Sequence, residues 1–432
     1  MISLLLFLAA DPVAETDALF APFGSTKPGC VAGIVRNGKT VFAKGYGTAD
    51  IEQNTPLTAK SVFYLASVSK QSMAFAILLL EKQGKLSIDD AIGKYVEGLP
   101  THTAAITLRQ LLHHTSGVRD YLMLGGLAGL SQDHVWTEHG ALATIKRQKA
   151  LNFAPGSEFS YSNSGYVLLS LAAQKAIGGK LDPWMRDNVW KPLGMAQSRW
   201  QHDHRDPIPS KAHGYVNGPK IADSMLDVVG DGGMYASLDD LLRWAANFDT
   251  RKLGGELLDR MRQPGPNAGN YGMGLSTGKY RGHETVSHGG SLAGYRTMLF
   301  RIPSMDFTAV CLCNDGGQNA GTFANRLADI WLKVERGWNQ LHRQQGSVLQ
   351  TPPVVRFKDT NRSSEYLGTW RSEELDAVYK IGQSADGSLT VEDPSGRIRA
   401  LAATNLVFWL NSLDVLLLSV GRVHGIELRR LP

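Results

Sequence analysis

The sequence has 432 residues, 43% hydrophobic and 20% charged, so it can bury one large core or two unequal ones. Its 45 Lys and Arg residues against 40 Asp and Glu leave a formal net charge of only +5, and the basic residues are scattered. The sequence contains no Lys/Arg run of the kind that follows a phosphate backbone, so its composition argues against nucleic-acid binding.

The chain opens on an apolar run, Ile2 to Ala10, that ends in small residues. This pattern is typical of a secretory signal, although the run is short and no Lys or Arg precedes it. We therefore expect residues 1–10 to be a signal segment and the protein to be periplasmic or secreted. The alternatives are a hydrophobic N-terminus of a cytoplasmic protein or a mis-set start codon. No other apolar stretch approaches the roughly 18 residues of a membrane-spanning helix, so we expect no stable membrane span.

The three cysteines, Cys30, Cys311 and Cys313, form no CxxC pair and no disulfide framework. An odd and sparse set fits either an oxidising or a reducing compartment. Sparse usage favours free thiols, and a single bridge from Cys30 to Cys311 or to Cys313 is the alternative.

Short strands are expected on both sides of a long mixed region. Cys30–Arg36 and Thr40–Gly45 are joined by Asn-Gly, the strongest short hairpin signal. The β-rich runs Tyr295–Ile302 and Phe307–Cys313 precede a helix expected over residues 321–336. Strands at both ends of a region with helices between them indicate an α+β domain whose antiparallel sheet is closed by its own termini.

Between these strands lies a helix expected to run from Ser67 to Gln83. Residues 73–80 are apolar on almost every face, and Gly84 follows as a C-cap. A helix without a polar face is normally buried in the middle of a domain. The pattern therefore places Ser67 at the start of a central, buried helix.

The C-terminal part of the chain differs in composition. Residues 337–362 are polar, with Gln-Gln-Gly-Ser and Thr-Pro-Pro, which is typical of a linker. Beyond them, β-rich segments recur at roughly ten-residue spacing, which predicts a small antiparallel β-barrel over residues 363–432. The segments are Tyr366–Trp370, Ala377–Ile381, Ser388–Glu392, Arg397–Leu401, Leu406–Leu410, Val415–Val420 and Gly425–Leu428.

Ser67 and Lys70 form a Ser-x-x-Lys pair at the start of the expected buried helix. A serine hydroxyl is a poor nucleophile unless a base within hydrogen-bond reach takes its proton. At i and i+3 on a helix the two side chains share a face, and the positive end of the helix dipole favours negative charge at the serine. Lys70 can accept a proton only in its neutral form, which burial of a lysine favours.

Both short motifs of this chemistry occur twice. Ser-x-x-Lys recurs at residues 276–279, in a glycine-broken segment that cannot present both side chains on one buried helix face. Tyr-x-Asn occurs at residues 161–163, on a turn before the apolar helix expected over 166–177, and again at 215–217, in a ribbon flanked by Gly and Pro. In each case only the first copy has a setting that suits catalysis.

Four segments follow one another in a characteristic order. They are Phe63-Tyr64-Leu65-Ala66-Ser67-Val68-Ser69-Lys70, Thr107-Leu108-Arg109-Gln110-Leu111-Leu112-His113-His114-Thr115-Ser116-Gly117, Tyr161-Ser162-Asn163 and His288-Gly289-Gly290. Together they resemble the serine β-lactamase and penicillin-binding-protein superfamily. They are most similar to its branch of class C β-lactamases, D-Ala-D-Ala carboxypeptidases, D-aminopeptidases and esterases. The resemblance implies a β-lactamase/transpeptidase-like serine hydrolase domain over residues 15–336.

The resemblance also implies a role for each residue of the first motifs. Ser67 would attack the substrate carbonyl as the nucleophile. Lys70 and Tyr161 would pass its proton to the leaving group. Asn163 would hydrogen-bond the substrate amide.

The last motif, His288-Gly289-Gly290, is where the sequence departs from β-lactamases, which usually carry lysine at its first position. Histidine there resembles the peptidase and esterase members, and it offers a positive charge to an antibiotic carboxylate only when protonated. The resemblance places His288 among the catalytic residues and Gly289, Gly290 and Ser291 in substrate binding. The oxyanion would lie between the backbone N–H groups of Ser67 and Ser291, and the two glycines would let the strand approach the substrate.

Several other patterns favour structure over chemistry. Residues 289–293 are a near miss to G-x-S-x-G and lack a βαβ context. His202-Asp203-His204 has no supporting HExxH or CxxC and is interpreted as a solvated loop. Residues 230–233 are a glycine-rich loop expected to border the cleft, and His113-His114 is expected to buttress its loop.

The sequence thus predicts a serine hydrolase that forms an acyl-enzyme on Ser67, with no cofactor and no metal. The resemblance implies cleavage of amide bonds in D-amino-acid-containing peptides, of the D-aminopeptidase or D-Ala-D-Ala carboxypeptidase type. The alternatives are a promiscuous esterase or weak β-lactamase, and a penicillin-binding sensor that acylates without efficient turnover. In each case the partner is a small peptide, ester or β-lactam. The C-terminal β segment resembles the lipocalin-like domains of D-aminopeptidases, which usually carry two.

Overall fold

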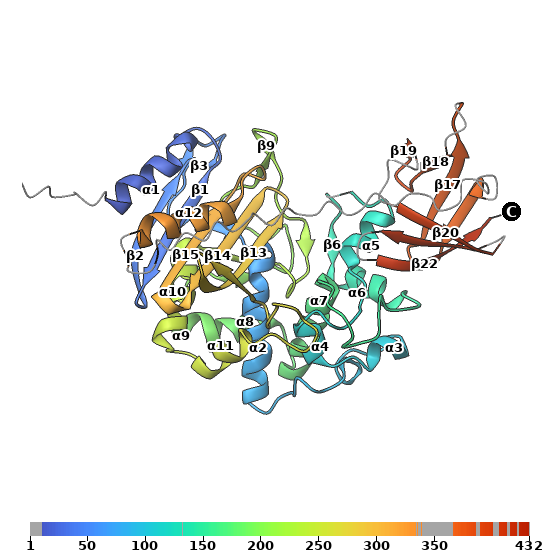
Figure 1. The fold of residues 1–432 in the computed structure, drawn as a ribbon, viewed down its shortest axis with the longest axis horizontal. Helices are drawn as coiled ribbons and strands as arrows, with labels where there is room; N and C mark the ends of the chain where they lie inside the picture. Colours follow the sequence, from blue (N-terminus) through green and yellow to red (C-terminus); the bar gives the residue numbers. More distant parts are fainter. Residues whose placement is uncertain are drawn as a thin grey trace, which may run out of the picture. The chain divides into compact units, whose positions relative to one another are not determined.

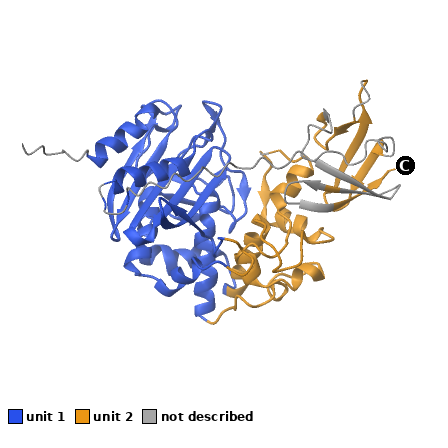
Figure 2. Ribbon diagram, viewed as in Figure 1, with its two compact units in different colours: residues 1–83, 177–264, 270–344 blue, residues 84–176, 265–269, 345–432 orange. Residues whose placement is uncertain are grey.

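The computed structural model describes residues 11–131, 133–333, 335, 338, 366–385, 389–400, 406–412, 415–420 and 423–431. The chain divides into two compact units (Figure 2): residues 1–83, 177–264 and 270–344 form unit 1, and residues 84–176, 265–269 and 345–432 form unit 2. The signal segment expected at residues 1–10, and the expected linker apart from residue 338, lie outside the described residues. The domain boundaries expected from the sequence remain predictions.

A six-stranded antiparallel sheet forms the centre of unit 1 (Figure 1), in the order β12-β13-β14-β15-β1-β2. Its strands are β1 (Cys30–Arg36), β2 (Lys39–Tyr46), β12 (Ser276–Tyr280), β13 (His283–Leu292), β14 (Tyr295–Ile302) and β15 (Phe307–Cys313). β1 pairs with β15 along its whole length, from Cys30 opposite Cys313 to Arg36 opposite Phe307. This pairing confirms the expected closure of the sheet by strands from the two ends of the domain.

The β1–β2 hairpin forms where the Asn-Gly pair predicts it. Asn37 and Gly38 both take positive φ, 48° and 71°, as the favoured two-residue hairpin turn requires. β1, β14 and β15 have the predicted bounds, and β2 is one residue longer at each end than predicted. Strand alternation and turn chemistry are local properties, so these elements could be predicted from the sequence.

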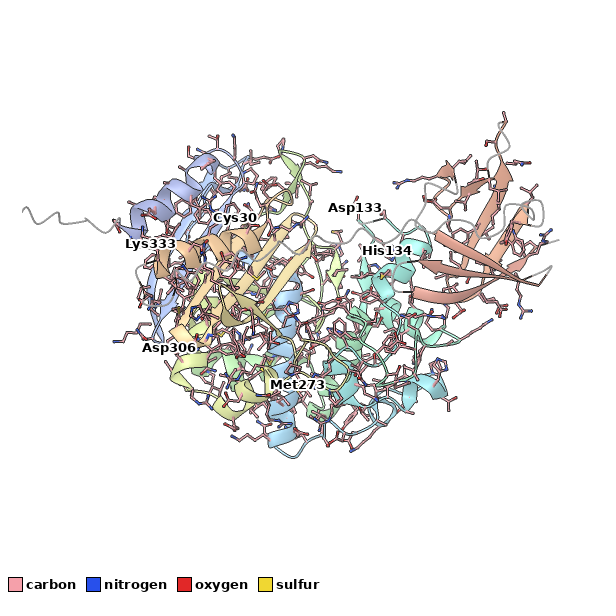
Figure 3. All side chains as sticks on the ribbon, viewed as in Figure 1. Cys30, Asp133, His134, Met273, Asp306 and Lys333 are labelled. Carbon is pink, nitrogen blue, oxygen red and sulfur yellow. A yellow bond between two sulfur atoms is a disulfide. The ribbon has the colours of Figure 1, made fainter. Side chains whose placement is uncertain are left out.

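Helices cover both faces of this sheet. On one face, α1 (Pro12–Phe20) and α12 (Ala320–Leu332) share a hydrophobic cluster with β1 and β15. Lys333, which is labelled in Figure 3, lies just after α12. It forms an ion pair with Glu15 of α1. On the other face lies α10 (Leu238–Thr250), because a Cβ on Gly33 of β1 would meet the side chains of Leu238 and Leu242. Successive strand residues point to opposite faces, so both faces of β1 are packed.

The central helix α2 (Ser69–Lys82) is buried on nearly every side, as its apolar pattern predicts. Met73, Phe75, Ile77 and Leu78 are each 0% exposed. The helix differs from the prediction at its start, because Ser67 lies in the 3₁₀ turn η2 (Ala66–Val68) that leads directly into α2.

The remaining elements of unit 1 are short. Three of them, β5, β11 and β7, pair as a small sheet that leads into η2. In the described part of the chain, no helix is both long and apolar enough to cross a membrane. The short elements are η1 (Ala21–Phe23), β3 (Thr48–Asp50), β4 (Thr55–Pro56), β5 (Val62–Tyr64), α8 (Leu181–Met185), η4 (Arg186–Trp190), α9 (Lys191–Leu193), β7 (Arg199–Trp200), β8 (Tyr215–Val216), β9 (Lys220–Ile221), β10 (Leu226–Asp227), β11 (Met234–Ser237), α11 (Gly255–Met261) and η5 (Pro303–Met305).

Unit 2 combines a helical region with the C-terminal sheet. Its helices and first strand are η3 (Ile92–Lys94), α3 (Thr101–Ala104), α4 (Leu108–Leu112), α5 (Tyr121–Leu127), β6 (Trp136–Thr137), α6 (Glu138–Lys146) and α7 (Asn163–Ile177). The C-terminal strands are β16 (Gly368–Ser372), β17 (Ala377–Gln383), β18 (Leu389–Glu392), β19 (Ile398–Ala400), β20 (Leu406–Ser412), β21 (Val415–Val420) and β22 (Val423–Arg430).

The C-terminal strands form one antiparallel sheet in the order β19-β18-β17-β16-β22-β21-β20. The predicted antiparallel character is confirmed, but closure into a barrel is not: in the described residues the sheet is open, with the short β19 at one edge and β20 at the other. The sheet also shares its core with α5, because Leu124 and Leu127 pack in one cluster with Trp370 and Tyr379. The hydroxyl of Tyr379 donates a hydrogen bond to the carbonyl of Leu127. The helical region thus completes the core of the C-terminal sheet.

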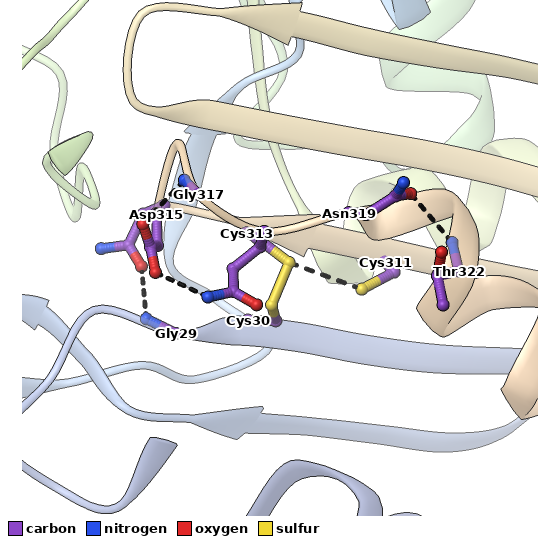
Figure 4. Close-up of a disulfide and its surroundings, with 10 residues drawn as sticks. Gly29, Cys30, Cys311, Cys313, Asp315, Gly317, Asn319 and Thr322 are labelled. Carbon is purple, nitrogen blue, oxygen red and sulfur yellow. Dashed lines mark hydrogen bonds between the residues drawn. A yellow bond between two sulfur atoms is a disulfide. The ribbon is translucent and has the colours of Figure 1, made fainter. Parts of the chain in front are cut away.

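Cys30 and Cys313 form a disulfide that joins β1 to β15 (Figure 4). This bridge corrects the expectation of free thiols. The strand register places the two residues directly opposite each other, although they are 283 residues apart in the sequence. Cys311 keeps a buried thiol whose Sγ lies 3.7 Å from that of Cys313. Burial raises the pKa of the Cys311 thiol.

Replacing Cys30 with Ala is expected to lower the free energy of unfolding by about 2–5 kcal/mol, because the bridge restricts the unfolded chain across a long loop. Urea unfolding followed by circular dichroism measures this loss. The matched control is Cys311→Ala, which removes a neighbouring thiol and keeps the bridge. Equal losses in both variants would contradict a stabilising role for the bridge.

Candidate active site

Ser67 and Lys70 meet at the start of the buried helix. Ser67 is partly exposed in η2, whereas Lys70 is fully buried in the first turn of α2. Lys70 Nζ lies 3.2 Å from Ser67 Oγ and donates a hydrogen bond to it. The same amine donates to the carbonyl oxygen of Asp231 at 2.6 Å. The predicted interaction within the Ser-x-x-Lys motif is therefore present.

The contact to Asp231 was not predicted from the sequence. Residues 230–233 were expected only to border the cleft, but their loop brings a main-chain carbonyl to Lys70. The loop is held by Tyr64, whose hydroxyl oxygen accepts a hydrogen bond from Gly233 N at 3.2 Å. Its glycine-rich run is the one signal in the sequence that marks a close backbone approach.

The backbone around Ser67 is held in an unusual conformation. Ala66 has φ of 49°, in the region where residues with a Cβ are strained, and such residues cluster at functional sites. Leu65 is fixed on both sides, because its N–H donates to Met234 O at 2.9 Å and its carbonyl accepts from Thr297 Oγ1 at 2.8 Å. The turn that carries the nucleophile candidate is thus clamped between β11 and β14.

His288 is a neutral imidazole in this setting. Burial, together with the nearby charge of Lys70, lowers the pKa of His288 from 6.5 to about 4. Its Nδ1 lies 2.7 Å from the carbonyl oxygen of Gly289, and its Nε2 lies 2.9 Å from the hydroxyl of Tyr271. The tautomer that satisfies both contacts carries its proton on Nδ1 and accepts from Tyr271 at Nε2. Tyr271 is a partner that the sequence pattern did not reveal.

The strand that carries His288 also presents the residues expected to bind substrate. β12 pairs with β13 only as far as Ser276 opposite Ser287, so residues 288–292 continue beyond the last β12 pair. Gly290 lies against the turn before Ser67, since a Cβ there would overlap Leu65 O and the side chain of Thr297. The missing side chain of Gly290 therefore lets β13 approach the backbone beside Ser67, and Ser291 follows it on the exposed end of the strand.

Tyr161 and Asn163 lie in unit 2, at the turn that begins α7. Asn163 N donates to Asp120 Oδ2 at 2.6 Å, so a carboxylate caps this helix. The other oxygen of Asp120 accepts from Met123 N at 3.0 Å and caps α5. Ser164 Oγ donates to Arg119 O at 2.7 Å. One carboxylate therefore ties the starts of two helices together, a role that spacing in the sequence did not indicate.

His114 supports the same turn, as expected of the His113-His114 pair. Its Nδ1 accepts a hydrogen bond from Ser162 N at 3.1 Å. Its ring lies 4.2 Å from the ring of Tyr161, centroid to centroid, with 35° between the planes. The side chain of Tyr161 is thus packed against a buried imidazole, which limits its motion.

The second copies of the two motifs begin on strands β12 and β8. Ser276 and Lys279 lie on strand β12, where residues three apart point to opposite faces. The hydroxyl oxygen of Tyr215 accepts from Ile51 N at 2.9 Å, and this tyrosine is buried. The sequence interpretation of both copies agrees with these positions.

The histidine-rich segment after residue 201 is an ion-paired surface network. Asp203, His204 and Asp227 have ligand-type atoms within 4.8 Å of one another. Asp203 is engaged by Arg205 at 2.5 Å, and His204 Nδ1 lies 3.0 Å from Asp227 Oδ2. All three residues are partly buried, so the interpretation of this segment as a solvated loop stays a prediction.

The sequence-predicted site residues fall into both units. Ser67, Lys70 and residues 288–291 lie in unit 1, where Lys70 contacts Ser67 and its charge reaches His288. Tyr161 and Asn163 lie together in unit 2.

The neutral state of His288 predicts a specific pH dependence of stability. The unfolded chain binds a proton at this residue below about pH 6.5, whereas the folded protein stays unprotonated there until about pH 4. The contribution of neutral His288 to the unfolding free energy is present above pH 6.5 and is lost as the pH falls to 4. The difference in unfolding free energy between the wild type and His288→Gln should therefore shift by roughly 3 kcal/mol, against the wild type, across that range.

Urea unfolding at several pH values checks this expectation. The control is His139→Gln, which removes an exposed histidine of α6 and should leave the profile unchanged. A difference between wild type and His288→Gln that stays constant with pH would contradict a neutral His288.

Comparisons with known proteins identify the family of the chain. Residues 16–330 match the β-lactamase family. A D-aminopeptidase from a strain of Cereibacter sphaeroides is 30% identical over 380 residues, which cover 85% of this chain and 68% of the relative. A D-aminopeptidase from Brucella anthropi is 27% identical over 373 residues, which cover 84% of this chain and 67% of the relative.

Solved structures share the fold at lower identity. The octameric penicillin-binding protein homologue from Pyrococcus abyssi aligns with a TM-score of 0.64 and 22% identity, over 95% of this chain and 92% of that one. SurE with D-Leu gives 0.60 and 22% identity over 97% and 100% of the two chains. The D-amino acid amidase from Ochrobactrum anthropi SV3, complexed with D-phenylalanine, gives 0.60 and 20% identity over 75% and 99%. With most of its length matched by the family, the chain belongs to the β-lactamase family and is a serine hydrolase of that family.

Proposed function

We propose that the protein forms an acyl-enzyme on Ser67 and cleaves the amide bond that follows an N-terminal D-amino acid. The observation that carries the proposal is the contact between Lys70 Nζ and Ser67 Oγ on the buried helix, in a chain whose curated relatives are D-aminopeptidases. SurE has been solved with D-Leu, and the D-amino acid amidase with D-phenylalanine and also with L-phenylalanine, so the choice of a D-amino acid rests on the curated relatives.

In the proposed acylation, Ser67 Oγ attacks the amide carbonyl as its proton passes to the pair formed by Lys70 and Tyr161. The backbone N–H groups of Ser67 and Ser291 stabilise the oxyanion. Collapse of this intermediate breaks the C–N bond, and the leaving nitrogen receives a proton through Lys70 and Tyr161. The carbonyl of Asp231 holds the lysine amine in place throughout. Asn163 binds the amide of the substrate.

Deacylation uses the same groups, with water as the nucleophile and Ser67 as the leaving group. Water loses a proton to Tyr161 and Lys70 as its oxygen attacks the ester carbonyl. The C–O bond to Ser67 then breaks, and Ser67 Oγ regains the proton. The product leaves as a carboxylic acid and loses its proton to the solvent, and the enzyme returns to its starting protonation state.

The neutral imidazole of His288 favours an aminopeptidase over the alternative enzymes whose substrates carry a carboxylate. β-Lactams and D-Ala-D-Ala peptides both carry a carboxylate, which binds best to a fixed positive charge. His288 supplies no such charge above about pH 4. An aminopeptidase substrate instead carries a cationic amine, which needs no positive charge at His288.

We also propose that the protein acts outside the cytoplasm. The apolar segment at residues 1–10 and the Cys30–Cys313 bridge support an oxidising compartment.

Replacing Ser67 with Ala is expected to lower kcat/KM on D-Ala p-nitroanilide by about 10⁴-fold or more, because the proposed acyl acceptor is removed. The matched control is Ser276→Ala in the second Ser-x-x-Lys copy, which should keep wild-type activity. Undiminished activity of Ser67→Ala would refute the proposal. Assays on L-Ala p-nitroanilide, p-nitrophenyl esters and nitrocefin distinguish a D-aminopeptidase from an esterase or a β-lactamase.

Replacing Tyr161 with Phe removes the proposed proton carrier and should lower kcat by about 100-fold or more with a smaller change in KM. The control is Tyr215→Phe in the second Tyr-x-Asn copy, which loses a structural hydrogen bond to Ile51 N and should keep its kcat. Steady-state kinetics on both variants provide the measurement. Equal kcat values for Tyr161→Phe and the wild type would exclude a proton-transfer role.

A further inference from the structure

A buried ion pair joins the C-terminal sheet to the helical region of unit 2. Arg119 Nη1 lies 2.6 Å from Glu374 Oε2, and the two side chains are 1% and 2% exposed. Glu374 lies in the turn between β16 and β17, whereas Arg119 directly precedes Asp120, the residue that caps α7. The pair therefore connects a C-terminal strand turn to the segment that holds the Tyr-x-Asn motif.

The carboxylate of Glu374 has further partners that fix its position. Its Oε2 also accepts from Lys149 N at 2.8 Å, and its Oε1 accepts from Glu427 N at 3.3 Å on β22. Gln148 completes the network, since its side chain accepts from Arg119 Nη1 at 3.1 Å and donates to Glu374 O at 3.3 Å. The position of the Arg119 guanidinium is thus set by the sheet and by the end of the α6 segment together.

On the other side of this pair, the backbone of residues 119–121 holds the start of α7. Arg119 O accepts from Ser164 Oγ at 2.7 Å, and Tyr121 N donates to the same hydroxyl at 2.8 Å. Between them, Asp120 Oδ2 accepts from Asn163 N at 2.6 Å. Residues 119–121 therefore hydrogen-bond to the first two residues of α7, Asn163 and Ser164.

We propose that Glu374 is a positioning residue for catalysis: it fixes Arg119, and through residues 119–121 it holds Asn163 and the turn that carries Tyr161. The inference rests on the proposed roles of Tyr161 and Asn163. It gives the C-terminal sheet a part in the reaction, because the carboxylate that anchors this segment comes from the β16–β17 turn.

A purely stabilising role explains this pair less well. Two charges taken out of water lose much of their hydration, and replacing such a pair by apolar residues is often neutral or stabilising. Burial lowers the pKa of Arg119, and the charge of Glu374 opposes this effect. The pair is costly to bury, and Arg119 belongs to the segment that hydrogen-bonds to the turn of Tyr161 and Asn163. This combination is expected of a pair that sets the geometry of that turn.

The test is Glu374→Gln in the full-length protein, which keeps the size of the side chain and removes its charge. The matched control is Glu373→Gln, which breaks the exposed neighbouring pair with Lys149. Two rates are measured below the unfolding midpoint of each variant: kcat on D-Ala p-nitroanilide, and the rate at which a fluorescent fluorophosphonate labels Ser67. Glu374→Gln should lower both rates by about 10- to 100-fold with little change in KM. Glu373→Gln should stay within about twofold of the wild type.

The outcomes separate positioning from stability. A lowered melting temperature with unchanged rates in Glu374→Gln would overturn the inference. If Glu374→Gln does not fold, the double variant Arg119→Met/Glu374→Leu leaves no buried charge unpaired, and slowed labelling with restored stability supports positioning. Wild-type labelling rates in this double variant would overturn it.

Failure of the proposed function gives a different result. If the wild type does not cleave D-Ala p-nitroanilide but Ser67 is labelled, the substrate assignment fails while the labelling comparison still decides the role of Glu374. Slowed labelling in Glu374→Gln would then support positioning without the peptidase activity.

Discussion

The buried amine of Lys70 is the group around which the catalytic part of the molecule is arranged. An ammonium or amine without contact to water needs hydrogen-bond partners, and Lys70 has Ser67 Oγ and the carbonyl of Asp231. These two partners offset the cost of burying the amine among the apolar side chains of α2, and one of them requires the close approach of the 230–233 loop. Lys70 also affects His288, whose imidazole stays neutral because it is buried beside the lysine.

The sheet of unit 1 holds these parts in register. β1 and β15 come from opposite ends of the domain, and their pairing carries the Cys30–Cys313 bridge. The same sheet extends through β14 to β13, so that Gly290 lies against the turn that precedes Ser67. Strain at Ala66 persists because hydrogen bonds from β11 and β14 determine the backbone on either side of it.

Unit 2 uses polar contacts in place of a sheet to hold its own functional turn. Asp120 caps α5 and α7 with one carboxylate, and His114 packs against Tyr161. The C-terminal sheet is part of this unit, because α5 completes its core and Glu374 reaches Arg119. The C-terminal β segment therefore shares a hydrophobic core and a buried ion pair with the helical region of this unit.

The sequence by itself determined the features that depend on near neighbours. Periodicity and turn residues predicted β1, β14, β15 and the buried helix, and the order of the motifs predicted the family and the Ser67–Lys70 pair. Only the tertiary structure decided the partners of these groups. Strand register and loop packing bring together residues at least 17 positions apart in the chain. They bring Asp231 to Lys70, Tyr271 to His288, Cys30 to Cys313 and Arg119 to Glu374. Such contacts leave no local pattern, because either partner alone reads as an ordinary loop or strand residue.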